Sequence, residues 1–101
     1  MKAFYTMVGT ETEATDLVET LLEEQLIACA NLIETRSFYR WEGQDHDEDE
    51  YLLLMKTTAS CWENCRDRLD DLHPYDVPAI IELDAEANGA YAEWVDTQVR
   101  D

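Results

Sequence analysis

The first half of the chain alternates between strand-like and helical hydrophobic patterns. Residues 2–8 form a short run rich in β-forming side chains, which predicts a buried strand. From Thr10 onward apolar residues recur at helical spacing. Thr10 and Glu13 match a capping box, so we expect a helix that runs to about Gln25. Residues 26–41 lack a sustained helical stripe and gain β-branched and aromatic side chains toward their end, which predicts one long strand.

A second long strand follows this one. Residues 43–50 are polar and predict a connection, after which residues 51–58 resume strand character, so the two strands are expected to form an antiparallel hairpin. Both are longer than a small sheet requires, and the tip carries Phe38, Tyr39 and Trp41. Ribbons of this kind expose unpaired backbone and apolar rings, which predicts self-association through sheet edges.

The remaining elements complete a known topology. A capping box at Ser60 predicts the start of a second helix. This helix is expected to end at His73, because helical geometry is disfavoured for a residue that precedes a proline. Residues 77–83 predict a fourth strand, and Asn88 is expected to cap a terminal helix. The order is βαββαβ plus a C-terminal helix. It predicts a single α+β domain over residues 1–101, a ferredoxin-like split βαβ sandwich with a four-stranded antiparallel sheet and helices on one face.

The charge of the chain excludes one class of partner. Twenty-four Asp and Glu residues oppose seven Lys and Arg residues, and the net charge of −17 repels nucleic acid and anionic lipid surfaces. A disordered tail, a cation-binding surface and a solvated coat are the alternatives that this acidity allows. The acidic residues are spread along the whole chain, and Lys2 and Lys56 are the only lysines. This distribution favours a salt-adapted coat, typical of a halophilic source.

Cysteine usage and hydropathy indicate the compartment. Cys29, Cys61 and Cys65 are an odd number of cysteines, and we expect reduced thiols rather than a disulfide framework. No apolar run is long enough to cross a bilayer, and the start of the chain reads as a strand rather than a signal peptide. We therefore expect a cytoplasmic protein with no membrane partner.

Four motifs in matching order make the chain resemble the CutA family of divalent-cation tolerance proteins over nearly its full length. They are Leu-Ile-Ala-Cys-Ala-Asn-Leu at 26–32, Phe-Tyr-Arg-Trp-Glu-Gly at 38–43, Met-Lys-Thr-Thr at 55–58 and His-Pro-Tyr-Asp-Val-Pro at 73–78, followed by Tyr91 and Trp94. The resemblance implies a ferredoxin-like fold and a homotrimer with sheet edges paired between subunits. It also implies a role in tolerance to copper and other divalent cations.

The resemblance further implies a site in a cleft between subunits. Cys29 and His73 are the implied soft-metal ligands, and the other implied cleft residues are Tyr39, Trp41, Glu50, Lys56 and Tyr75. Thiolate and imidazole groups suit copper, and less so zinc, although no cofactor is required.

Each candidate residue also has a structural alternative. Cys29 also fits a small buried side chain in a strand, which is the favoured reading, and Cys65 belongs to the apolar stripe of its helix. The imidazole of His73 can instead bond the last helix carbonyls, and Trp41 can be an oligomer contact. Lys56 should seek a carboxylate, for which Glu50 is a candidate.

Three functions follow from these observations. The first is a trimeric metal-binding protein, the second is a signalling module resembling PII proteins that binds a small effector, and the third is a structural scaffold. The acidic residues 45–50 lack EF-hand spacing and read as a solvated loop. Enzymatic activity is not expected, because the sequence contains no Gly-x-Ser-x-Gly elbow, P-loop or Gly-x-Gly-x-x-Gly motif.

Overall fold

The computed structural model describes residues 1–100. Its elements are β1 (Lys2–Val8), α1 (Glu11–Glu23), β2 (Cys29–Trp41), β3 (Gln44–Thr57), α2 (Trp62–Leu72), β4 (Ile80–Leu83) and α3 (Gly89–Gln98). The strands form one sheet in the order β2-β3-β1-β4, and every neighbouring pair is antiparallel. The predicted α+β, ferredoxin-like arrangement is confirmed.

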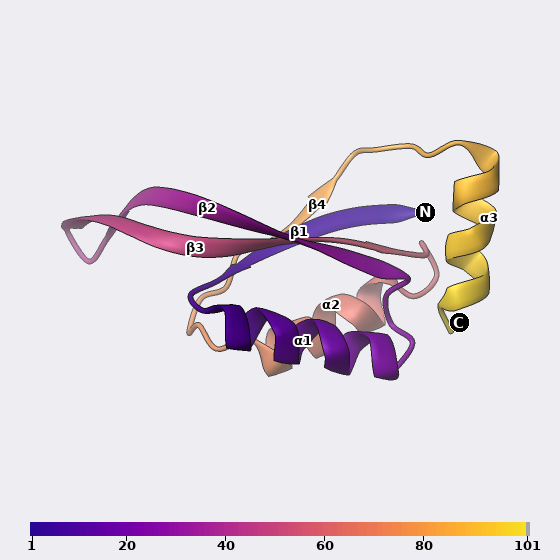
Figure 1. Ribbon diagram of the computed structural model, residues 1–101, viewed down its shortest axis with the longest axis horizontal. Coiled ribbons are helices and arrows are strands. Elements are labelled where there is room, and N and C mark those ends of the chain that lie inside the picture. The colour runs from indigo at the N-terminus through magenta and orange to yellow at the C-terminus, as the bar shows by residue number, and fades with distance from the viewer. Residues whose placement is uncertain (101) are drawn as a thin grey trace.

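The core lies between the sheet and the helices α1 and α2, which cover one face (Figure 1). Successive strand residues point to opposite faces, so alternate positions of β1 and β3 supply the apolar layer. The buried strand residues are Phe4, Val8, Leu53 and Met55, and the helices add Leu17, Leu21, Cys65 and Leu69. The rings of Phe4 and Trp62 lie 4.7 Å apart between their centroids. We call the opposite side, which carries Leu52, Leu54 and Lys56, the open face.

The third helix is the additional C-terminal helix that follows the βαββαβ order. α3 lies across the end of the sheet nearest the N-terminus (Figure 1). Its Val95 is fully buried, and Tyr91 Oη lies 3.2 Å from Cys29 Sγ. Asn88 occupies the N-cap position as predicted, although its side chain makes no capping hydrogen bond.

Residues 44–50 are part of a strand, so the prediction of a polar connection over residues 43–50 was wrong. β3 begins at Gln44, and the hairpin loop is Glu42–Gly43 alone. β1 pairs with β3 only as far as Tyr51, so the acidic half of β3 and its partner in β2 project beyond the sheet (Figure 1). The low β propensity of Asp and Glu is outweighed here by pairing with β2, and the carboxylates of residues 45–49 remain in water.

Three other boundaries differ from their predictions. β2 starts at Cys29 rather than at residue 26, because Leu26 and Ile27 turn inward and are almost fully buried. The second helix begins at Trp62 with Cys61 at the N-cap, not Ser60, and the Cys61 N–H donates to Thr58 Oγ1. The last strand covers residues 80–83 rather than 77–83. By contrast, Thr10 caps α1 as predicted and accepts from the Glu13 N–H.

The hairpin loop has both central residues in the left-handed region. Glu42 has φ 51° and Gly43 has φ 79°, and Trp41 pairs with Gln44 across the loop. Two positive φ angles in a two-residue loop match the twist of the flanking strands. Glycine is suited to this conformation, whereas a side chain at Glu42 is strained.

Replacing Gly43 by alanine is expected to lower the free energy of unfolding by about 1–2 kcal/mol, because an added Cβ disfavours positive φ. A Cβ at Gly43 meets no atom within 4 Å, so the cost is one of backbone conformation alone. Guanidinium unfolding checks the value. Gly89→Ala is the matched control in the first turn of α3, and it should leave stability equal or raise it. Equal effects of the two substitutions would contradict the role of the loop.

Candidate functional site

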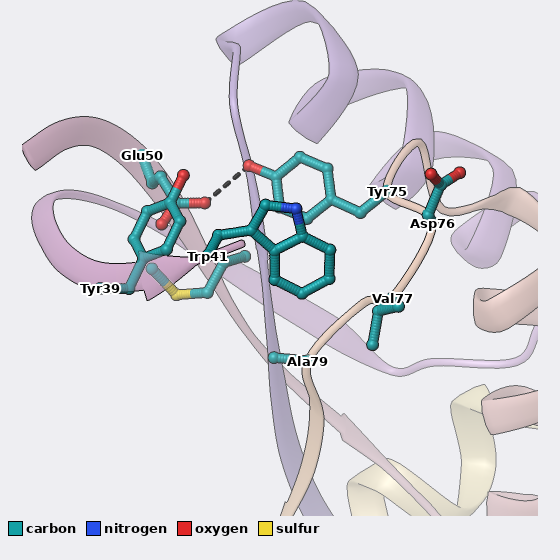
Figure 2. A pocket seen from close by; sticks show the side chains of 8 residues that line it. Tyr39, Trp41, Glu50, Tyr75, Asp76, Val77 and Ala79 are labelled. Atoms are coloured by element: carbon teal, nitrogen blue, oxygen red, sulfur yellow. Dashed lines mark hydrogen bonds between the residues drawn. The ribbon is translucent and has the colours of Figure 1, made fainter. Parts of the chain in front are cut away.

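A pocket of about 350 Å³ lies where the projecting ribbon meets the segment before β4 (Figure 2). Its lining residues are Met7, Tyr39, Trp41, Glu50, Tyr75, Asp76, Val77 and Ala79. Four of the residues singled out from the sequence, Tyr39, Trp41, Glu50 and Tyr75, therefore lie around one cavity of a single chain. Three separate segments, β1, the hairpin and residues 75–79, contribute to it.

Glu50 and Tyr75 form the hydrogen bond at the back of this pocket. Glu50 lies on β3 one residue beyond the end of the pairing with β1, and only 8% of it is exposed. The Tyr75 hydroxyl donates to Glu50 Oε2 at 2.6 Å (Figure 2). Burial and this bond raise the pKa of Tyr75, so its phenol stays protonated and remains a donor.

The ribbon wall of the pocket consists of aromatic side chains. Tyr39 and Trp41 stand on the same face of β2, two residues apart. The Tyr39 hydroxyl donates to Glu48 Oε2 at 2.7 Å, and that bond raises the pKa of Tyr39. The Tyr39 ring stacks on His46, with centroids 4.9 Å apart and planes inclined by 8°. The indole of Trp41 remains 48% exposed and is open to a ligand.

His73 anchors the other wall through a hydrogen-bond chain. Its Nδ1 accepts from the Tyr75 N–H at 3.1 Å, and its Nε2 lies 2.8 Å from Thr6 Oγ1. The Thr6 hydroxyl donates its single proton to the Ala79 carbonyl at 2.7 Å. His73 must therefore donate from Nε2 to Thr6, which fixes a neutral ring protonated at Nε2. Both nitrogens are engaged, and a metal ion at His73 would have to displace one of these bonds.

Cys29 and Lys56 lie away from the pocket. They pair across β2 and β3 on the open face, and Lys56 is six residues from Glu50, about 20 Å along the strand. The Lys56 ammonium donates to Asn31 Oδ1 at 3.1 Å, so within one chain it does not pair with Glu50, the candidate partner. The sequence could not reveal this distance, because residues 43–50 were expected to form a loop rather than part of the strand that carries Lys56.

Cys29 and His73 are on opposite faces of the sheet. His73 bonds Thr6, which pairs with the core residue Leu53, whereas Cys29 pairs with Lys56 on the open face. Within residues 1–100 no group of three or more His, Cys, Asp or Glu side chains is placed to hold a metal ion. The structure thus does not bring the two implied soft ligands together in one chain.

The other two cysteines belong to the core. Cys61 and Cys65 are almost fully buried. Burial, with a smaller effect of Cys61, raises the pKa of Cys65 to about 12, which keeps that thiol protonated. A protonated buried thiol is a poor metal ligand, and the prediction that Cys65 packs in the core is confirmed.

Sequence reasoning missed four lining residues of the pocket. Asp76 and Val77 lie within the His-Pro-Tyr-Asp-Val-Pro motif and could have been found from it. Met7 and Ala79 have no functional group that would mark them in the sequence. They line the pocket because β1 lies beside residues 75–79.

Comparisons with known proteins identify the family of the chain. The family described as CutA1 divalent ion tolerance protein matches residues 2–98. The chain belongs to the CutA family. The divalent-cation tolerance protein CutA of Pyrococcus horikoshii is 46% identical over 92 residues, which cover 90% of each chain.

Solved CutA structures share the whole fold. The crystal structure of CutA1 from Pyrococcus horikoshii superimposes with a TM-score of 0.95 at 41% identity and covers 100% of both chains. A structure titled PII-like protein CutA from Nostoc, in apo form, has a TM-score of 0.94 at 27% identity and covers 99% of this chain and 98% of that one. Among the described residues of this CutA chain, no helix has the length and apolar character needed to span a bilayer.

We expect the contribution of His73 to stability to depend on pH. Burial lowers the pKa of His73 below its ordinary value. The unfolded ring binds a proton near pH 6.5, so the stabilisation is complete above about pH 6.5 and is lost as the pH falls through the lower folded pKa. His73→Gln should therefore cost about 1–3 kcal/mol at alkaline pH, through loss of the buried bonds, and less in acid.

Urea unfolding of the wild type and of His73→Gln across this pH range measures the difference. Thr6→Ser keeps the hydroxyl that accepts from His73, and it should preserve the pH dependence. A difference between wild type and His73→Gln that stays constant with pH would contradict the neutral, doubly bonded ring.

Proposed function

We propose that this chain acts in tolerance to divalent cations as a homotrimer whose subunits pair through their sheet edges. The observation that carries the trimer is the unpartnered outer edge of β2. The strand pairs only with β3, so along its 13 residues one row of backbone groups has no strand partner in the described chain. The family membership supports the role in cation tolerance.

The side chains of this ribbon support an assembled state. Phe38 is 67% exposed, Ile33 is 46% exposed and Leu32 is 40% exposed. The other edge strand, β4, exposes Ile81 and Leu83. Pairing one edge of each subunit with a different edge of the next gives a closed ring, which covers both edges at once.

Light scattering in concentrated potassium chloride should give about three times the mass of one chain. Ile33→Glu is expected to dissociate the assembly, because it places a carboxylate in a buried edge contact. Leu22→Glu is the matched control, since Leu22 is similarly exposed but lies on α1. A monomeric wild type, or equal dissociation by both substitutions, would refute edge pairing.

Copper, and more weakly zinc, is the proposed cation, and Cys29 is the proposed soft ligand. Cys29 is half-buried, whereas Cys61 and Cys65 are buried. Its sulfur lies beside Tyr91 Oη, at the end of the sheet where α3 crosses. His73 is the second proposed ligand, and it would come from a different subunit, because the two residues lie on opposite faces within one chain. Its binding requires release of one of the two ring hydrogen bonds.

Calorimetry with Cu(I), Cu(II) and Zn(II) tests the cation. Saturable copper binding is expected in the wild type, and Cys29→Ala should weaken it about ten-fold or more through loss of the thiolate. Cys61→Ala removes a buried thiol and should leave binding unchanged. Binding that does not exceed a nonspecific carboxylate background, or that ignores Cys29→Ala, would reject the metal site.

A second candidate function is the binding of a small effector, as in a PII-like signalling module. The pocket favours it, because rings and a buried carboxylate converge there with their orientation fixed by Tyr75 and His73. The neighbour titled as PII-like, at a TM-score of 0.94, supports the same candidate.

A further inference from the structure

We propose that the pocket beside Glu50 binds a small organic ammonium cation, held between the ring of Trp41 and the Glu50 carboxylate. This inference rests on the second candidate function, the binding of a small molecule in the pocket, and it names the chemical class of that molecule. The positive charge would face the carboxylates, and the alkyl groups would contact the aromatic and apolar wall.

The charge of the lining residues is the first observation behind the cation. Glu50 and Asp76 are both acidic, and none of the lining residues is Lys, Arg or His. The ribbon arginines are engaged elsewhere, Arg36 with Asp47 and Arg40 with Asp45. The pocket thus has a negative charge that the neighbouring cations of the described chain do not neutralise.

Glu50 itself lacks a cationic partner. It is 8% exposed, and its hydrogen-bond partner among residues 1–100 is the neutral Tyr75 hydroxyl on Oε2. A carboxylate withdrawn from water is stabilised best by a positive charge at close range. An ammonium group in the pocket would supply that charge without disturbing the bond from Tyr75.

The aromatic rings are the second observation. Tyr39, Trp41 and Tyr75 all line the cavity, and Figure 2 shows their side chains drawn around it together with Glu50. The faces of such rings carry partial negative charge and attract cations, most strongly when the ring is an indole. Val77 and Met7 add apolar surface for methyl or methylene groups. A volume of about 350 Å³ suits a small organic ion.

The same features disfavour anionic effectors. Nucleotides and 2-oxoglutarate carry several negative charges, which would meet two carboxylates and no basic side chain in the lining. The described pocket has the opposite charge from a phosphate-binding site, for which Lys, Arg or a glycine-rich loop is typical. A cation is therefore the class that the pocket selects.

Calorimetry on the full chain, at low salt, tests the class with probes that differ only in charge. Choline and 3,3-dimethylbutan-1-ol have nearly the same shape, but only choline is positively charged. Ethylammonium tests whether N–H donors strengthen binding, and ATP and 2-oxoglutarate serve as anions. We expect choline or ethylammonium to bind about ten-fold more tightly than the neutral alcohol, and the anions not to bind.

Two matched pairs of variants locate the site. Glu50→Gln removes the charge and keeps an acceptor for Tyr75, whereas Glu34→Gln makes the same change on an exposed part of β2 outside the pocket. Trp41→Leu removes the pocket indole, and Trp94→Leu removes one of similar exposure on α3. Loss of cation binding is expected only in Glu50→Gln and Trp41→Leu. Circular dichroism and light scattering on each variant verify fold and assembly.

Other outcomes overturn the proposal in distinguishable ways. Equal binding of choline and its neutral analogue, or equal loss in Glu34→Gln, would show that the pocket does not recognise the charge. Saturable binding of an anion alone would keep the effector function and reject the cation. No binding by any probe would reject both, while the trimer and the copper site are judged by their own measurements.

Discussion

The antiparallel pairing of β2 with β3 is the constraint on which the rest of the structure depends. It runs without interruption from Cys29 opposite Lys56 to Trp41 opposite Gln44. One half of this ribbon belongs to the sheet and covers the core, and the other half extends past β1. Because register fixes which face each side chain occupies, the same pairing puts Tyr39, Trp41 and Glu50 on the open face. A slip of one residue would turn them all to the other side.

The pocket needs a second, independent anchor, which the His73 hydrogen bonds provide. The segment 73–79 has no strand pairing of its own before Ile80. The bonds from His73 to Thr6 and from Thr6 to Ala79 tie it to β1, and the Tyr75 hydroxyl reaches across to Glu50. A neutral imidazole with both nitrogens engaged thus serves mainly as a structural support. These bonds hold His73 in place whether or not a metal ion binds.

The carboxylates of the ribbon are paired with arginine or exposed to water, with one exception. On the ribbon, Arg36 and Arg40 each bind an aspartate across the strands, and the remaining carboxylates stay in water. Exposed pairs of this kind contribute little each, about 0–1 kcal/mol. Glu50 is the exception, since it is buried at the point where the ribbon leaves the sheet. The one acidic side chain of the ribbon that is withdrawn from water therefore lies where a ligand can reach it.

The sequence by itself determined the order of elements, the cap at Thr10, the end of α2 before Pro74 and the fold class, because periodicity and capping depend on residues that are near neighbours. The family resemblance also implied that Tyr39, Trp41, Glu50 and Tyr75 share a cleft, which it placed between subunits. Tertiary structure alone decided that residues 44–50 form a strand, that Lys56 is remote from Glu50 and that Cys29 and His73 lie on opposite faces. These outcomes follow from strand register and from contacts between segments far apart in the chain, which local composition does not encode.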